Sequence, residues 1–317
     1  MKLLVAIALA LFASVGYAQY PSKPVRLIVP FPAGGIVELI GRAVTETVAT
    51  NWGQPILVEA KPGANGSIGT DSVAKSAPDG YTWVLATLSH TTNPSLSKSL
   101  PWHPINDFAG AAMLADVPAL AVVPATLPAS SMKEFVALAK SQPGRLNYMV
   151  PGSGTSMHLN SELLKLEAGI EMTGIPYKGL PPAIPDLLSG QLAFGFLSQP
   201  LAAPHIKAGK LRALAIVAPK RSKEFPDVPT MAEAGYHNAQ VVSWFAILLP
   251  AKTPRDIVLR INQEVVRALA SPEVIKRLEG AGASVAAPMK PEEIDTWLKT
   301  ETARWSKLVK DARIEAQ

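Results

Sequence analysis

Apolar, β-branched runs alternate with amphipathic runs along the chain, and a glycine-rich turn joins the two kinds of segment at two places. Residues 30–35 (PFPAGG) follow one apolar run, 25–29, and precede a helical repeat of apolar residues. Residues 151–156 (PGSGTS) occupy the same position between the run 147–150 and a second helical repeat. Strands that alternate with helices predict an α/β fold of mostly parallel sheets flanked by helices.

Each glycine-rich turn is predicted to be the entrance to a helix. The first N–H groups of a helix have no partner within it and carry about half a unit of positive charge. Such an entrance binds a carboxylate without a basic side chain. Two entrances about a domain's length apart indicate one anion held between two lobes. The alternative is that the glycines only permit tight turns and that Ser153, Thr155 or Ser156 is an ordinary helix N-cap.

The length of 317 residues favours two lobes, each with its own core. An apolar strand at 120–123 is followed by prolines, which predicts a crossing into the second lobe, and residues 244–249 read as a returning strand. We expect lobe 1 to comprise residues 19–121 and 243–317, and lobe 2 residues 122–242. Three helix starts follow in the tail, at 253–256, 271–273 and 290–293, each with a proline and acidic residues in the first turn.

The first 18 residues have the pattern of a secretory signal peptide. Lys2 precedes an apolar stretch, and small residues stand at Gly16 and Ala18. We expect cleavage near Ala18 and export of the mature protein. The chain has no cysteine, which excludes disulfides, thiolate metal sites and cysteine nucleophiles.

The net charge of +5 comes from scattered lysines and arginines. The densest group, residues 220–223 (KRSK), stands beside prolines without interleaved aromatic residues, so we interpret it as a solvated loop and expect no nucleic-acid partner. His158 and Glu162 share a helix face but have no third ligand near them in sequence, and we therefore predict no metal site.

Enzyme motifs are absent or incomplete. Residues 95–98 (SLSK) spell S-x-x-K, but the S-D-N motif that should follow is missing. Residues 152–154 (GSG) are not a nucleophile elbow, and the chain has neither a dinucleotide fingerprint nor a P-loop. We predict that the protein is not an enzyme and has no catalytic residues and no cofactor.

Five motifs in one order resemble the solute receptors of tripartite tricarboxylate transporters, known as TctC or Bug-type receptors. These motifs are PFPAGG at 30–35 with Arg42, PGANG at 62–66 running to APDGY at 77–81, GTSMHL at 154–159, PYKG at 176–179, and PHIKAGKLR at 204–212. The resemblance implies a periplasmic binding protein of the type II-like fold, with two crossing strands at the hinge. It also implies closure on a carboxylate-bearing solute and delivery to permease subunits of the TctA and TctB types. We expect the receptor to be a monomer.

The resemblance also implies a binding site. One carboxylate would be held by two loops, and other residues would contact the distal part of a dicarboxylate, tricarboxylate or aromatic carboxylate. The candidate ligand-binding residues are Phe31, Ala33, Gly34, Gly35, Ile36, Ser89, His90, Thr91, Ser153, Gly154, Thr155, Ser156, His158, Tyr177, Lys178 and Ser198. Leu197 stands where many members have an acid that could meet an ammonium group, which makes an amino-acid ligand less expected.

A periplasmic sensor is the alternative function. In that case the closed form would present itself to a signalling membrane partner, and only the outer surface of the lobes would differ. Neighbouring genes for a permease pair, as opposed to a two-component sensor, would distinguish the two functions.

Overall fold

The computed structural model describes residues 20–152, 154–177, 179–180 and 182–311. The predicted signal peptide, 1–18, and the candidate residues Ser153 and Lys178 lie outside the described residues. Within the described ranges, no helix combines the length and the apolar character needed to span a bilayer.

Strands and helices alternate through most of the chain. The strands are β1 (Val25–Val29), β2 (Ile56–Ala60), β3 (Thr82–Thr87), β4 (Phe108–Val117), β5 (Ala119–Pro124), β6 (Asn147–Val150), β7 (Thr173–Pro176), β8 (Gly195–Ser198), β9 (Leu211–Val217), β10 (Ser243–Pro250) and β11 (Ser284–Val285). The helices are α2 (Ile36–Trp52), α3 (Ser67–Ala74), α4 (Ser89–Leu96), α5 (Met132–Ser141), α6 (Ser156–Ala168), α7 (Ala183–Ser189), α8 (Gln199–Lys207), α9 (Arg255–Leu269), α10 (Pro272–Gly280) and α11 (Pro291–Asp311), with a short 3₁₀ helix η1 (Ala64–Gly66) before α3.

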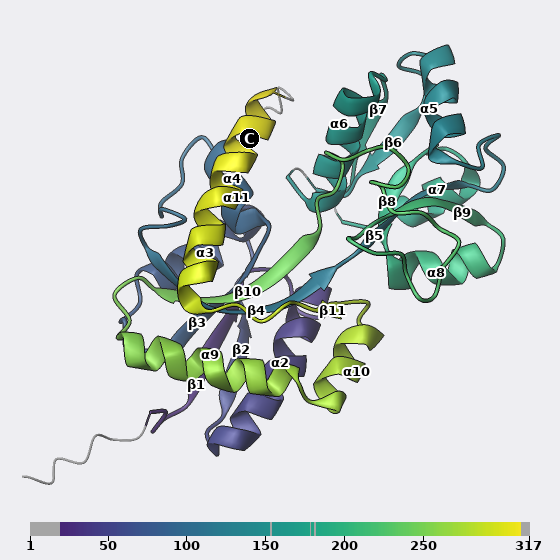
Figure 1. Cartoon of the computed structure of the whole chain (residues 1–317). Helices are drawn as coiled ribbons and strands as arrows, with labels where there is room; N and C mark the ends of the chain where they lie inside the picture. The colour runs from purple at the N-terminus through teal and green to yellow at the C-terminus, as the bar shows by residue number, and fades with distance from the viewer. Residues whose placement is uncertain (1–19, 153, 178, 181, 312–317) are drawn as a thin grey trace, which may run out of the picture.

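A six-stranded sheet in the order β11-β4-β10-β3-β1-β2 organises what we call the first body. Strand β1 pairs in parallel with β2 and β3, whereas β10 pairs antiparallel with β3 and β4. Helices α2, α9 and α10 lie on one side of this sheet, and α3, α4 and α11 lie on the other (Figure 1).

The second body contains helices α5 to α8 and two smaller sheets. Strand β5 is the centre of the antiparallel sheet β8-β5-β9, and β6 pairs in parallel with β7. A bridge between Tyr148 and Phe194 links the two sheets. Figure 1 shows this body beside the first, joined to it where β4 continues into β5 and where the chain returns into β10.

The sheets are mixed, so the prediction that they are mostly parallel is wrong for the strands that connect the bodies. The chain leaves the first body through β4 and re-enters it through β10, and these two neighbours therefore run in opposite directions. Parallel pairing occurs where a helix links consecutive strands, as between β1 and β2 and between β6 and β7. The boundaries proposed for the two lobes remain a prediction.

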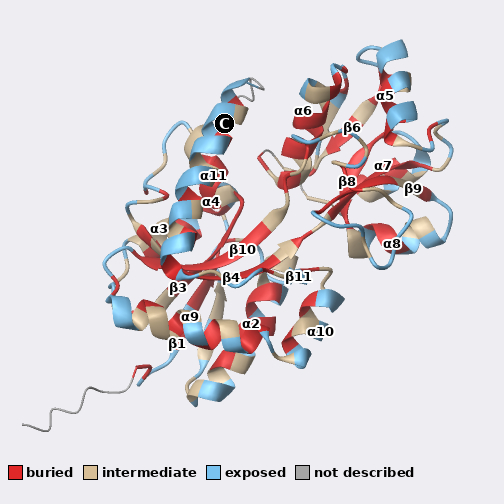
Figure 2. Cartoon of the chain, viewed as in Figure 1, coloured by how far each residue is buried: buried red, intermediate tan, exposed pale blue. Residues whose placement is uncertain are grey.

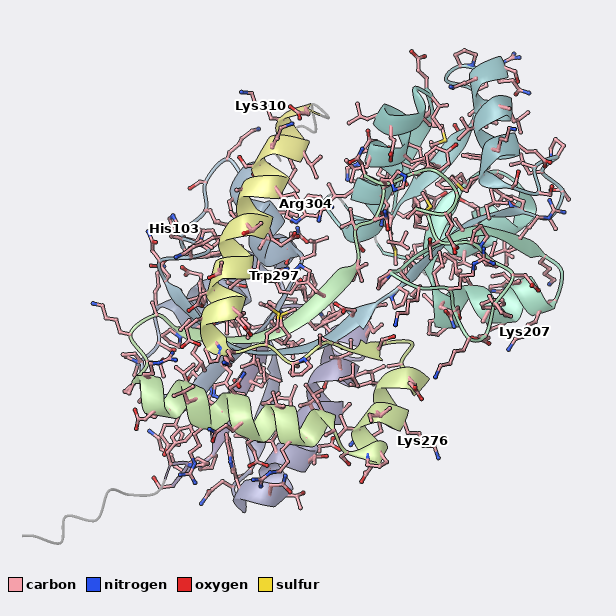
Figure 3. All side chains as sticks on the ribbon, viewed as in Figure 1. His103, Lys207, Lys276, Trp297, Arg304 and Lys310 are labelled. Carbon is pink, nitrogen blue, oxygen red and sulfur yellow. The ribbon has the colours of Figure 1, made fainter. Side chains whose placement is uncertain are left out.

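Buried residues follow the strands in both bodies, as Figure 2 shows along β4, β10 and β5. Burial of both faces explains why β4, β5 and β10 are nearly continuous apolar runs. Charged side chains are concentrated on the outer surface instead, although Glu264 of α9 is buried. The labelled Lys207, Lys276 and Lys310 belong to three different helices, α8, α10 and α11 (Figure 3).

Helix α6 holds the segment that returns from the second body to β10. The Asn160 side chain, which is fully buried, donates to the carbonyl of Val241 at 2.9 Å and accepts the Val241 N–H at 2.7 Å. Seven residues later on the same helix, the Glu167 carboxylate accepts the N–H groups of His237 and Asn238 at 2.8 and 3.0 Å. The last residues before β10 are therefore fixed to α6.

Candidate ligand-binding site

A cavity of about 240 Å³ lies between the two bodies. Its lining comes from the carboxyl ends of strands, from the loops and helix starts that follow them, and from the first residues of β10: Phe31, Ile36, Val37, Asn65, Thr87, Leu88, Ser89, Pro151, Gly154, Thr155, Ser156, Met157, Gly179, Leu180, Ser243 and Phe245. None of these residues carries a charged side chain. The cavity is smaller than the roughly 300–1,000 Å³ typical of pockets for drug-sized molecules, so it suits a small ligand.

Three helices begin at the cavity. Ile36, Ser89 and Ser156 are the first residues of α2, α4 and α6, and all three line it. Helix starts carry unpaired N–H groups and partial positive charge. Three of them around one cavity create a positive environment without a cationic side chain.

At the start of α2, the Glu38 side chain binds one backbone donor of the glycine-rich turn. Its carboxylate accepts the Gly34 N–H at 2.8 Å and pairs with the Arg42 guanidinium at 2.7 Å. The bond from Gly34, followed by that from Arg42, holds the pKa of Glu38 below its usual range. The N–H groups of Gly35, Ile36 and Val37 have no acceptor among the described residues.

At the start of α6, the turn is fixed by its own side chains. Thr155 is the N-cap, and its hydroxyl accepts the His158 N–H. The Gly154 N–H donates to Nδ1 of His158 at 3.1 Å, which orients this ring toward the backbone of the turn. Burial lowers the pKa of His158, which keeps Nδ1 free to accept this bond. The N–H groups of Ser156 and Met157 find no acceptor in the described part of the chain.

Hydroxyl groups form two pairs in the cavity wall. The Thr87 and Ser89 hydroxyls lie 3.0 Å apart at the start of α4, within the first body. The Ser156 and Ser243 hydroxyls lie 2.5 Å apart, and this contact joins α6 of the second body to β10 of the first. Each pair adds hydrogen-bond donors to a wall that also contains apolar side chains, Phe31, Phe245 and Met157 among them.

The structure brings six of the sixteen candidate residues into the cavity lining and places eight elsewhere. The six are Phe31, Ile36, Ser89, Gly154, Thr155 and Ser156. The eight outside the lining are Ala33, Gly34, Gly35, His90, Thr91, His158, Tyr177 and Ser198.

His90 lies in the core behind α4. Its ring stacks on Trp102 at 4.9 Å and meets Phe108 edge-on at 4.8 Å, and Nε2 lies 2.8 Å from the carbonyl of Pro104. Burial lowers the pKa of His90 to about 4, so the ring is neutral at physiological pH. The segment 89–93 forms the first turns of a helix, which turns His90 inward while Ser89 stays at the cavity.

Tyr177 and Ser198 make contacts within the second body. The Tyr177 hydroxyl donates to Asp186 at 2.6 Å, and Ser198 is the buried N-cap of α8. Leu197 is fully buried with Leu120 and Ile216 in the core of that body. The side chain at position 197 therefore does not line the cavity. The expectation that an amino-acid ligand is disfavoured cannot rest on Leu197.

Several lining residues were missed in the sequence. Ser243 and Phe245 lie two residues apart on one face of β10, and Phe245 pairs with Thr87 of β3. Alternation along the apolar run 243–249 could have placed Ser243 and Phe245 on one face of a strand. The same alternation does not show which strands β10 pairs with, and it therefore could not have placed this face at the cavity. Asn65 has left-handed backbone angles, φ 50° and ψ 41°, and the cluster of glycines around it was the signal for such a turn.

Within the described residues, no group of three or more histidine, aspartate and glutamate side chains is arranged to hold a metal ion. His158 Nε2 and Glu162 lie 3.9 Å apart, and Lys165 also pairs with that carboxylate at 2.9 Å. An ammonium group on the same carboxylate disfavours a cation at this position.

The family model for the tripartite tricarboxylate transporter family receptor, TctC, matches residues 40–314. The chain belongs to the TctC family. The family that the sequence motifs indicated is thus confirmed. BugT of Bordetella pertussis is 36% identical over 301 residues, covering 94% of this chain and 92% of BugT. A UPF0065 protein from the tcbD-tcbE intergenic region of a Pseudomonas species is 34% identical, covering 99% of this chain and 95% of its own length.

Solved structures of similar proteins have the same fold. The periplasmic binding protein BugD superimposes with a TM-score of 0.80 at 32% identity, covering 94% of this chain and all of BugD. Rpa4515 of R. palustris, solved with adipate, gives 0.82 at 32% identity, covering 94% of this chain and 100% of that chain. MatC from Rhodopseudomonas palustris, solved with malate, gives 0.78 at 33% identity, covering 92% and 100%. This TctC-family chain is therefore a periplasmic solute-binding protein of the α/β binding-protein fold, and not an enzyme.

Proposed function

We propose that this TctC-family receptor binds a small carboxylate in the cavity between its two bodies and delivers it to permease subunits of the TctA and TctB types. The ligand class is a dicarboxylate, tricarboxylate or aromatic carboxylate. The observation that carries the proposal is the meeting of three helix starts at one cavity without charged side chains among its described residues. At two of these starts, those of α2 and α6, backbone N–H groups have no acceptor in the described part of the chain.

The donors present are sufficient for a transport receptor. Micromolar affinity corresponds to about −8 kcal/mol. Hydrogen bonds to a charged group contribute roughly 1.5–3 kcal/mol each. Several such bonds from α2, α4 and α6 reach this value after the cost of ordering the ligand is subtracted. Adipate in Rpa4515 and malate in MatC support a dicarboxylate of this size.

The same lining supports selection against amino acids. An ammonium group requires a carboxylate or several acceptors, and none of the described lining residues is acidic. The absence of acidic side chains from the described lining thus replaces Leu197 as the reason to expect that amino acids bind poorly.

Movement of the two bodies is the proposed signal to the permease. The cavity takes donors from both bodies, so a ligand binds more tightly when they are close together and shifts the equilibrium toward that arrangement. The proposed hinge has two crossing segments. One is the junction of β4 with β5, and the other is the segment that leads into β10.

Calorimetry with citrate, adipate, malate, benzoate, aspartate and glutamate tests the ligand class. We expect binding of at least one of the first four and no tight binding of the amino acids. Tight binding of aspartate or glutamate alone, or of none of the six, would contradict the proposed ligand class.

The backbone donor at α2 has a matched pair of variants. Ile36→Pro removes the N–H but keeps the helix start, because proline is favoured at the first helical position and Gly35 already has extended angles, φ −82° and ψ 169°. Ile36→Ala removes the same apolar side chain and keeps the N–H. We expect Ile36→Pro to bind the carboxylate roughly tenfold more weakly than Ile36→Ala. Equal affinities would show that this N–H does not contact the ligand.

A further inference from the structure

One hydrogen bond in the cavity wall joins the two bodies directly. It links the hydroxyl of Ser156, the first residue of α6, to the hydroxyl of Ser243, the first residue of β10, over 2.5 Å. Both residues line the cavity, and Ser156 is 5% exposed. The contact therefore lies where a bound ligand would touch both bodies.

We propose that Ser243 is a ligand-binding residue that acts with Ser156 as one hydroxyl pair, donating a hydrogen bond to the ligand carboxylate. This inference rests on the proposed function. Each hydroxyl has one proton to donate and can accept two bonds. The bond within the pair uses one of the two protons. Neither hydroxyl has another partner among the described residues, so the second proton is available to an acceptor in the cavity.

The surroundings of the pair match a carboxylate. The N–H groups of Ser156 and Met157, for which the described residues supply no acceptor, lie at the same helix start. An oxygen that accepts from the pair therefore also meets the positive end of α6. A hydroxyl that accepts a bond from a second hydroxyl becomes a stronger donor. With no acidic side chain among the described lining residues, no carboxylate there competes for this proton.

Ser243 is also held close to α6 by the backbone. Asn160 fixes Val241 to α6, so the chain between this anchor and Ser243 consists of Val242 alone. The pair therefore stands where the return segment leaves α6 and enters β10 of the first body. Because Ser156 and Ser243 belong to different bodies, a ligand that needs the intact pair favours the arrangement in which the pair is formed.

A purely structural latch is the competing explanation. In that case the bond would stabilise the free protein, and its loss would lower the melting temperature without changing ligand affinity relative to a neutral variant. A ligand-binding pair has the opposite signature, because its loss weakens binding whatever happens to the free protein.

Calorimetry on Ser156→Ala, Ser243→Ala and the double variant separates these explanations, with whichever of citrate, adipate, malate and benzoate the wild-type protein binds. We expect each single variant to bind roughly tenfold more weakly. The double variant should be no weaker than about the weaker single variant, because the two hydroxyls act as a unit. Ser243→Thr keeps the hydroxyl and should retain most of the affinity.

Ser161→Ala is the matched control. Ser161 is a fully buried serine on the same helix, and its hydroxyl donates only to the carbonyl of Met157 at 3.0 Å. Its loss should leave ligand affinity unchanged. Melting curves of all variants show which of them fold. If Ser156→Ala does not fold, the comparison of Ser243→Ala with Ser243→Thr still tests the proposal.

The outcomes distinguish the two proposals. If the wild-type protein binds a carboxylate and Ser243→Ala binds it as tightly as Ser161→Ala does, the hydroxyl pair is overturned and the proposed function stands. If the two single effects multiply in the double variant, the serines act separately and the pair is again overturned. If the wild-type protein binds none of citrate, adipate, malate and benzoate, the proposed function fails and this inference falls with it.

Discussion

A second contact between the bodies joins Gly282 to Pro200. Because of this contact, we expect one added methyl group at position 282 to lower the stability of the protein strongly. Gly282 lies in the turn between α10 and β11 of the first body, and Pro200 lies in the first turn of α8 of the second. A Cβ at position 282 would stand 1.9 Å from Cγ and 2.2 Å from Cδ of Pro200. The proline ring cannot rotate away, so Gly282→Ala must shift the backbone or separate the two bodies.

The magnitude has two parts. Gly282 has φ +74°, and an alanine in this left-handed region costs roughly 1–2 kcal/mol. Overpacking against a rigid neighbour adds about 1–3 kcal/mol. Gly53→Ala is the matched control, because Gly53 has φ +63° and no atom within 4 Å of an added Cβ. We therefore expect Gly282→Ala to lower the free energy of unfolding by about 1–3 kcal/mol more than Gly53→Ala does.

Urea denaturation of both variants measures this difference, and small-angle scattering shows whether the bodies separate. Adding Pro200→Ala to Gly282→Ala removes the Cγ and Cδ atoms and should recover most of the packing loss. If Gly282→Ala were no less stable than Gly53→Ala and had the radius of the wild-type protein, Gly282 and Pro200 would not be in contact in solution.

Three further predictions concern the buried polar groups and the ligand. Asn160→Ala should destabilise the protein by roughly 2–4 kcal/mol in urea denaturation, because it leaves the buried N–H and carbonyl of Val241 unpaired, and a loss below 1 kcal/mol would contradict this reasoning. Burial holds the pKa of His90 at about 4 in the folded state, against 6.5 ordinarily, so only the unfolded chain gains this proton as the pH falls from 6.5 toward 4. The contribution of the neutral His90 ring to the free energy of unfolding is complete above pH 6.5 and should fall by roughly 3 kcal/mol as the pH falls from 6.5 to about 4. The urea midpoints of His90→Gln should not show this decrease with pH. A bound carboxylate at a hundred times its dissociation constant should stabilise the wild-type protein by about 2.7 kcal/mol, seen as a higher melting temperature, and no shift at saturation would argue against selective binding to the folded state.

Local patterns were sufficient to predict the helix entrances. Proline after Ser271 and after Lys290 marked the starts of α10 and α11, and the glycine-rich turns marked those of α2 and α6. These signals act over a few residues, through capping and backbone angles, and do not depend on the rest of the fold.

Contacts between segments far apart in the chain could not be predicted from such local patterns. The helix at Ser89 was missed because its sequence, SHTTNPSL, has weak helix formers and an internal proline, and tertiary packing decides its conformation. His90 looked accessible because the sequence does not show that Trp102 and Phe108 enclose it. Ser243 stands 87 residues from Ser156, and only the pairing of β10 with β3 and β4 brings it to the cavity.

The absence of ionisable side chains from the described cavity lining has a consequence for how the proposed receptor would respond to its surroundings. Amide and hydroxyl donors do not titrate near neutral pH, so the protonation of the solute itself would set the acidity at which it dissociates. Fixed dipoles in a partly enclosed cavity are also screened far less by dissolved salt than exposed charges are. Capture would then proceed with similar strength in dilute and in saline media, which suits a protein whose compartment follows the composition of the water outside the cell.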